Sequence, residues 1–202
     1  MLLHAPKAIR GALEALWTID ATLQGIVAGA NDPMLARIKL AWWRDQLEAL
    51  DRGPPPAEPR LEAIARELVS RGISGGNIAE IEVGWAALLD QPPDFSKLMS
   101  RGATLFELSG QLLGANDPFL SSAGRMFAFM TAARLGYEPP QDLTPPDFTP
   151  LIGHSMPRRI RCVTALARLA VRDFRHGAPF EPEGTRGRAL EVLAHLWSGR
   201  VA

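Results

Sequence analysis

The sequence predicts an all-α protein, a bundle of about eight helices forming one domain over residues 1–202. In every periodic segment, apolar residues recur at the spacing of an α-helix, and no segment shows the strict alternation of a half-buried β-strand. Short connections containing glycine and proline separate these segments. A length of 202 residues is also enough to bury one substantial core.

Signals at the helix ends define the first half of the bundle. Asp32 is a good N-cap for the second helix, with Pro33 at the first helical position, where its missing N–H costs nothing. The segment Arg52-Gly53-Pro54-Pro55-Pro56 must end that helix, and glycine or proline follows each of the next two. We therefore expect helices over residues 6–29, 33–50, 59–71 and 77–90.

The second half follows the same rules. Asp94 can cap the fifth helix, Asn116-Asp117-Pro118 begins the sixth, and Gly136 ends it. Residues 138–152 contain five prolines and must form a loop inside the domain. We therefore expect helices over residues 94–114, 118–135, 157–175 and 184–198.

The helix over residues 33–50 has an unusual distribution of polar residues. Its apolar arc covers more than half of the circumference, which predicts a helix packed on several sides. Lys39 and Gln46 lie within this arc, seven residues apart on one line. Such groups either extend to solvent or point into an internal cavity. Trp42 and Trp43 lie beside them and are either core residues or part of a cavity wall.

Composition excludes several classes of function. Twenty-two basic and twenty-two acidic residues cancel, so no global field attracts nucleic acid. The single cysteine, Cys162, excludes an internal disulfide and a cysteine-rich metal site. The sequence shows no secretion signal and no apolar run long enough to span a membrane. We therefore expect a cytoplasmic protein, and peripheral contact with a membrane stays open.

Polar residues also interrupt apolar stripes on other helices. Asp20 stands in the apolar stripe of the first helix, as a cavity carboxylate or as the partner of a cation on a neighbouring helix. On the fifth helix a continuous polar line is either a cavity wall or the solvent face. On the seventh helix a basic stripe is either solvated or binds an anion. The fifth-helix line comprises Ser100, Thr104, Glu107 and Gln111, and the seventh-helix stripe comprises Arg161, Arg168, Arg172 and Arg175.

Motifs for phosphate loops, zinc proteases, serine hydrolases and EF-hands are absent, and the histidines lack the spacing of paired metal ligands.

Residues 36–50, ARIKLAWWRDQLEAL, resemble the "RLxWWRDxLEAL" helix of the squalene/phytoene synthase family. The resemblance is strongest to the branch that includes a respiratory complex I assembly factor. Residues 12–17, 104–114 and 123–128 are similar to further helices of that family in order and spacing. The resemblance implies an isoprenoid-synthase fold, a helical bundle around an apolar cavity for prenyl chains.

The departures from the family's pattern concern its metal ligands. Enzymes of that family hold Mg²⁺ with two aspartate-rich motifs on facing helices, and Mg²⁺ ionises the diphosphate. The corresponding positions of the first helix are Gln24 and Ala28, and residues 118–137 contain no acidic residue. We therefore expect neither a metal site nor a cofactor, and no condensation of prenyl diphosphates by the usual mechanism.

The leading hypothesis is a degenerate, non-catalytic member of the family. It would bind an isoprenoid or lipid, or a protein partner, through the inherited bundle, with Lys39, Trp42, Trp43, Gln46, Thr104 and Gln111 as cavity candidates. The alternative is an active prenyltransferase that binds Mg²⁺ at an unconventional site around Asp20, Glu107 and Gln111. A third hypothesis is a helical interaction protein with a filled core. Arg161, Arg168 and Arg172 are the candidates for binding an anion.

Overall fold

The computed structural model describes residues 4–202, and all regular structure in that range is helical. One isolated antiparallel bridge joins Ser155 to Arg200. The α-helices are α1 Lys7–Ala28, α2 Pro33–Ala49, α3 Pro59–Glu67, α4 Gly75–Ala86, α5 Phe95–Leu112, α6 Leu120–Arg134, α7 Arg161–His176 and α8 Arg186–Ser198. The prediction of an all-α bundle of about eight helices is confirmed for this range.

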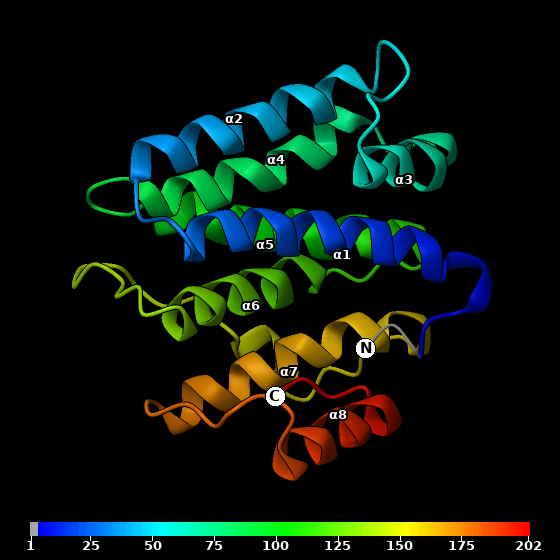
Figure 1. The fold of residues 1–202 in the computed structure, drawn as a ribbon. Helices are drawn as coiled ribbons and strands as arrows, with labels where there is room; N and C mark the ends of the chain where they lie inside the picture. The colour runs from blue at the N-terminus through cyan, green and yellow to red at the C-terminus, as the bar shows by residue number, and fades with distance from the viewer. Residues whose placement is uncertain (1–3) are drawn as a thin grey trace.

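The helices stack in layers from one end of the molecule to the other (Figure 1). The α2 and α4 helices form one outer layer, α1 and α5 lie in the middle, and α6 connects them to α7. Helix α8 covers the far side of α7, so that the layer of α2 and α4 and the pair of α7 and α8 are at opposite ends of the molecule. The core extends through these layers and is built from fully buried leucine, isoleucine and aromatic side chains of most helices.

Two of the expected capping residues, Asp32 and Asp94, begin their helices, whereas the predicted start of the sixth helix at residue 118 is wrong, since α6 begins at Leu120 without a side-chain cap. Asp32 accepts hydrogen bonds from the backbone N–H groups of Met34 and Leu35 at 2.8 and 3.2 Å. Asp94 caps α5 through the N–H groups of the second and third following residues. The predicted helix over residues 59–71 is divided into α3 and a 3₁₀ turn at Val69–Arg71. Residues 138–152 form the expected loop, with one 3₁₀ turn at Thr149–Leu151.

Two glycines let α5 and α6 cross in close contact. A Cβ atom placed on Gly102 would lie 2.1 Å from the carbonyl oxygen of Gly124, and one on Gly124 would lie 2.1 Å from that of Gly102. Real Cβ atoms do not approach so closely, so any larger residue must push the helices apart. This crossing sets the position of α6, which carries part of the cavity described below.

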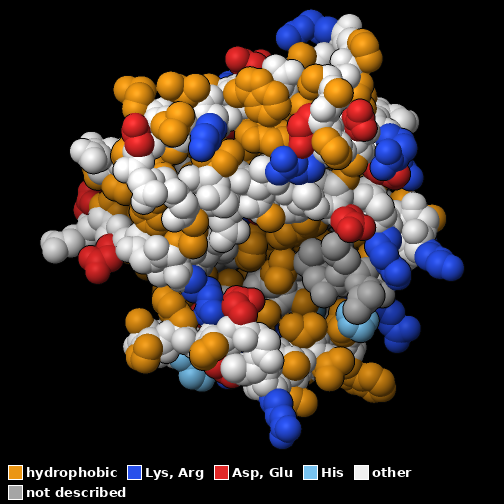
Figure 2. Space-filling view, viewed as in Figure 1, with side chains coloured by type: hydrophobic (Ala, Val, Ile, Leu, Met, Phe, Trp, Pro, Cys, Tyr) orange, Lys and Arg blue, Asp and Glu red, His pale blue; other side chains and the backbone are white. Residues whose placement is uncertain are grey.

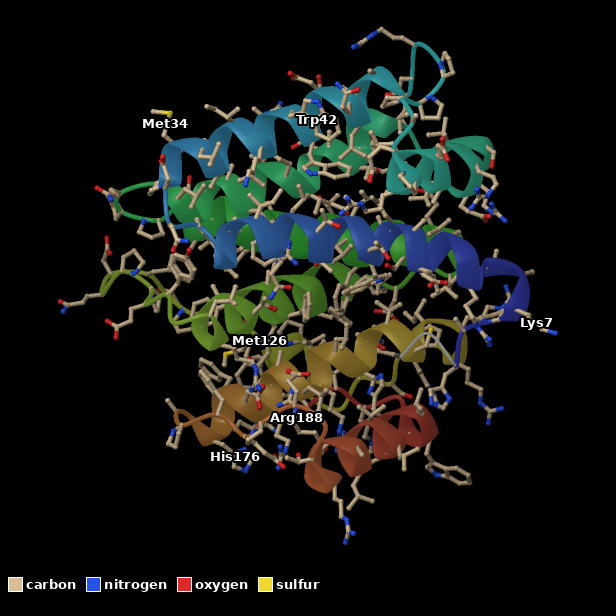
Figure 3. All side chains as sticks on the ribbon, viewed as in Figure 1. Lys7, Met34, Trp42, Met126, His176 and Arg188 are labelled. Atoms are coloured by element: carbon tan, nitrogen blue, oxygen red, sulfur yellow. The ribbon has the colours of Figure 1, made fainter. Side chains whose placement is uncertain are left out.

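The prediction that α2 is packed on several sides is wrong. Its buried residues are Ala36, Leu40, Trp43 and Leu47, which form a single stripe. The opposite side is open because α2 lies at the edge of the molecule, with its neighbours on one side only (Figures 1 and 3). Hydrophobic side chains gather over this edge in the space-filling view (Figure 2). The exposed fractions are 67% for Met34, 48% for Leu35, 60% for Ile38 and 44% for Trp42.

Within residues 4–202, no helix has the length and hydropathy required to cross a bilayer.

Candidate functional site

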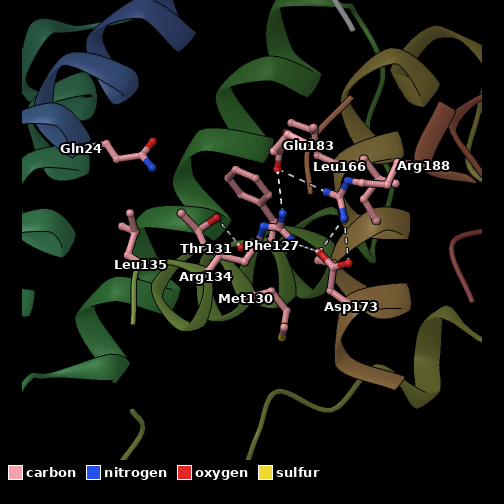
Figure 4. A pocket seen from close by; sticks show the side chains of 12 residues that line it. Gln24, Phe127, Met130, Thr131, Arg134, Leu135, Leu166, Asp173, Glu183 and Arg188 are labelled. Atoms are coloured by element: carbon pink, nitrogen blue, oxygen red, sulfur yellow. Dashed lines mark hydrogen bonds and ion pairs between the residues drawn. The ribbon is translucent and has the colours of Figure 1, made fainter. Parts of the chain in front are cut away.

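A cavity of about 320 Å³ lies between α1, α6, α7 and the segment that leads into α8 (Figure 4). This volume is at the lower end of the range for small-molecule sites. The cavity has an apolar wall and a charged end. Its lining residues are Gln24, Phe127, Met130, Thr131, Arg134, Leu135, Leu166, Leu169, Ala170, Asp173, Glu183 and Arg188.

The apolar wall comes from one face of each of two helices. On α6, Phe127, Met130 and Arg134 follow helical spacing, and on α7 the lining residues at 166, 169, 170 and 173 do the same. Each helix therefore turns an apolar face toward the cavity and ends that face with a charged residue. Near the other end of the wall, Phe127 packs edge-on against Trp17, with ring centroids 5.6 Å apart.

The charged end is centred on Asp173, which is only 4% exposed. The Nη1 group of Arg188 donates to both oxygens of Asp173, at 2.7 and 2.9 Å. The Nη1 group of Arg134 donates to Oδ2 of the same carboxylate at 2.9 Å. One buried carboxylate thus fixes two guanidinium groups. A carboxylate with two cationic partners tolerates burial, because its charge is more than neutralised.

Glu183 closes this cluster from the solvent side. Its Oε1 atom lies 3.4 Å from Nη2 of Arg134 and 3.4 Å from Nη2 of Arg188. Its side chain is 78% exposed, whereas those of Arg134 and Arg188 are 21% and 7% exposed. With Glu183 in place, the cluster has two positive and two negative groups and is neutral.

Asp20 lies in the core and not in this cavity. Its carboxylate accepts from Nε and Nη2 of Arg101 at 2.7 and 2.6 Å, and from Nε1 of Trp85 at 2.9 Å. The Arg101 guanidinium also stacks on the Trp85 ring, 3.9 Å from its centroid. The structure therefore confirms the second interpretation of Asp20, the partner of a cation on a neighbouring helix, and the cation is Arg101 of α5.

The polar line of α5 faces outward. Glu107 and Gln111 are exposed and Thr104 is half-buried, and these residues line neither the cavity nor a site shared with Asp20. The expected convergence of Asp20, Glu107 and Gln111 is absent because the Asp20 carboxylate faces Arg101, on the buried side of α5.

Three of the other cavity candidates lie together, but on the outer surface. Lys39, Trp42 and Trp43 line an open groove of about 460 Å³ between α1, α2 and α3, together with Ile38 and Arg60. Lys39 is exposed, so it extends to solvent. Gln46 is half-buried and lies outside this groove. Of the two interpretations of Lys39, extension to solvent is therefore confirmed, and the groove beside the tryptophans is an external surface and not an internal cavity.

Three arginines of the basic stripe of α7 bind acceptors in α8 and in the segments that flank α7 and α8, and the fourth, Arg175, lies over the ring of Phe148. Arg161 donates to the backbone carbonyls of Met156, Leu196 and Trp197, at 2.9, 3.1 and 2.6 Å. Arg168 binds Glu191 at 2.6 Å and the carbonyl of residue 200, and Arg172 pairs with Glu181. The predicted anion site is therefore occupied by the protein's own acceptors, because α8 packs on this side of α7 (Figure 1).

Sequence reasoning missed the four charged residues of the cavity. One signal was available for Asp173, which follows Leu166 and Ala170 on the apolar face of α7, as Asp20 follows apolar residues in α1. Arg134 likewise ends an apolar line on α6, after Phe127 and Met130, but a basic residue in the last turn of a helix is common because it meets the negative end of the helix dipole. Glu183 and Arg188 gave no comparable signal, because they occur among other charged residues.

Among residues 4–202, no group of three or more histidine, cysteine or acidic side chains could hold a metal ion. Searches of family models, of curated proteins and of solved structures found no match for this chain.

Proposed function

We propose that this chain is a non-catalytic relative of the squalene/phytoene synthases that binds an apolar ligand in the cavity between α1, α6 and α7. Support comes first from the sequence resemblance around the paired tryptophans and from the all-helical architecture. In the proposed isoprenoid-synthase-like fold, α1 and α6 take the places of the helices that carry aspartate motifs in that family. The cavity lies between these two helices.

The observation that carries the proposal is that the cavity combines an apolar wall with a lining from α1 and α6 that has no strong ligand for Mg²⁺. Gln24, Thr131 and Arg134 line the cavity from α1 and α6, and none of them is a ligand that Mg²⁺ favours strongly. The one buried carboxylate, Asp173, is engaged by two arginines. A prenyl or acyl chain fits such a cavity. The ionisation of a diphosphate requires bound Mg²⁺, and these residues do not supply the ligands to hold it.

Calorimetric titration with farnesol tests this function. We expect binding that does not depend on Mg²⁺, and loss of binding in Leu166→Trp, which fills the cavity with a larger side chain. Leu193→Trp places the same residue on α8, at a position 55% exposed, and should bind like the wild type. Circular dichroism checks that both variants are folded.

Two results would contradict the proposal. Farnesol binding that persists unchanged in a folded Leu166→Trp variant would place the ligand elsewhere. Release of diphosphate from farnesyl diphosphate in the presence of Mg²⁺ would show an enzyme.

The second candidate function is binding of a protein partner, and the outer face of α2 favours it. Soluble monomers seldom expose a contiguous apolar patch of this kind without use. We propose a second copy of the chain as the occupant, because a twofold interface sets one surface against itself and the α2 face has charges of both signs. Lys39 and Arg60 line the groove, and the exposed Asp45 lies three residues after Trp42 on the same face. Sedimentation should show a dimer for the wild type and a monomer for Ile38→Glu. A wild-type monomer at all concentrations would reject this candidate.

A further inference from the structure

We propose that the charged end of the cavity binds the anionic head group of an amphiphile, a carboxylate or a phosphate ester, and that Glu183 occupies this site when the ligand is absent. This inference rests on the proposed function, because the apolar wall of the same cavity would hold the ligand's chain. It adds the chemistry of the head group and a device that regulates access.

The two guanidinium groups converge on one point. The Nη2 atoms of Arg134 and Arg188 come from different helices and approach the same oxygen of Glu183 (Figure 4). Guanidinium groups bind carboxylate and phosphate oxygens well, because their planar N–H donors match the geometry of these anions. The Glu183 carboxylate thus marks where a ligand's anionic oxygen would lie.

Both guanidinium groups are held in place without Glu183. Asp173 accepts from each of them, and the carbonyl of Glu181 accepts a further bond from Nη2 of Arg134 at 2.8 Å. A preorganised pair of donors loses little freedom when a ligand binds. Asp173 neutralises only one of the two positive charges, so that the site without Glu183 has one positive charge in excess.

Glu183 itself is weakly held. Its two contacts of 3.4 Å are longer than ordinary charge-assisted hydrogen bonds, and most of its side chain is in solvent. Exposed ion pairs of this kind contribute little to stability. Glu183 also lies between Pro182 and Gly184, in a connection outside the helices, and Gly184 has a positive φ of 77°. A ligand oxygen can therefore replace this carboxylate without disturbing a helix.

The position of the site relative to the apolar wall favours an amphiphile over a free anion. Arg134 is on the same face of α6 as Phe127 and Met130, and Asp173 continues the face of α7 that contains Leu166. A head group between the guanidinium groups would thus have its chain along the apolar wall. The wall supplies the hydrophobic part of the binding free energy, and the arginines select the head group.

The experiment compares three probes that share one chain: dodecanoate, dodecyl phosphate and dodecanol, each below its aggregation concentration. Calorimetric titrations use the wild type, Glu183→Gln and Arg134→Gln. A matched control, Glu80→Gln, makes the same change of charge at an exposed position of α4.

We expect both anions to bind the wild type more tightly than dodecanol does. Glu183→Gln should raise their affinity about fivefold, because it removes the competing carboxylate. Arg134→Gln should lower their affinity about tenfold or more. Dodecanol should bind all variants equally, and Glu80→Gln should match the wild type for every probe. The tighter of the two anions identifies the class of head group.

The possible failures are distinct. Equal affinity for the anions and dodecanol in the wild type, unchanged by Glu183→Gln and Arg134→Gln, would overturn the head-group site and leave the proposed function in place. Binding of none of the three probes, together with no binding of farnesol, would overturn both.

Discussion

Replacing Asp20 by alanine removes the carboxylate that faces Arg101 in the core. The two side chains are 5% and 0% exposed, so the arginine cannot reach solvent to recover its hydration. Nε1 of Trp85 also loses its acceptor. The cation–π contact between Arg101 and the Trp85 ring remains, but the ring offers no negative charge.

These contacts set the expected magnitude. Removing one partner of a buried ion pair costs about 3–5 kcal/mol, because the other charge is left uncompensated. An unsatisfied buried donor costs about 1–3 kcal/mol, and the two effects overlap because both concern the same carboxylate. We therefore expect Asp20→Ala to lower the free energy of unfolding by about 3–5 kcal/mol, a large part of the stability of an ordinary domain.

Urea denaturation followed by circular dichroism measures this loss. The double variant Asp20→Leu/Arg101→Met replaces both charges by apolar groups and should be more stable than Asp20→Ala, because no buried charge remains. Glu107→Ala, at an exposed acidic residue of α5, should leave stability within about 0.5 kcal/mol of the wild type. A loss below about 1 kcal/mol for Asp20→Ala would refute the reasoning. A small loss combined with abolished Mg²⁺ binding would instead support the catalytic alternative.

Three further predictions follow from packing and burial. Gly102→Ala should cost about 1–3 kcal/mol in urea denaturation, because the new methyl group collides with the backbone of Gly124; a neutral effect would contradict the close crossing. Leu40→Ala, at a fully buried position, should lower the free energy of unfolding by about 2–5 kcal/mol. Ile38→Glu, on the exposed side of α2, should change the free energy of unfolding of the monomer by less than about 0.5 kcal/mol. Equal effects would contradict the open face of α2. Burial lowers the pKa of His195 from 6.5 to about 4, so the unfolded chain binds the proton first, and stability should fall by up to about 3 kcal/mol as the pH decreases from 6.5 to 4. His195→Gln should reduce this slope in urea denaturation measured across that range, and an unchanged slope would assign it to other groups.

The helices could be predicted because their signals are local. Asp32 and Asp94 begin helices through bonds to N–H groups two and three residues ahead, so a few letters of sequence contain the whole interaction. The apolar period of α1 likewise identified the buried line of leucines and the anomalous Asp20. Helix ends without such a cap were predicted less exactly. Helix α7 begins at Arg161, after a 3₁₀ turn, and not at the predicted residue 157.

The partners of the charged residues could not be predicted, because they depend on how distant helices pack. Arg101 is 81 residues from Asp20 in the sequence. The two side chains meet only because the whole core sets the crossing angle and the register of α1 and α5. The stripe containing Arg161 and Arg168 shows the same limit. Several of its acceptors are backbone carbonyls at the end of α8, which the side-chain pattern does not encode.

The open face of α2 has a different cause. Composition and period identify an apolar arc but not the number of neighbours available to cover it. Helix α2 is in an outer layer, so only one stripe of the arc meets other helices (Figure 1). The same sequence pattern is therefore compatible with a central helix and with one that binds a second molecule.

Asp20 and Asp173 give the same signal in sequence, a carboxylate on the apolar face of a helix, yet the structure uses them differently. Asp20 has one arginine, and the pair is sealed in the core with equal charge. Asp173 has two arginines, and the excess positive charge lies where the cavity opens to solvent beside Glu183. A buried carboxylate with one cation closes a core, whereas one with two cations can position both for a third, exchangeable anion. The number of cationic partners, more than the burial of the carboxylate, therefore separates the structural pair from the candidate binding site.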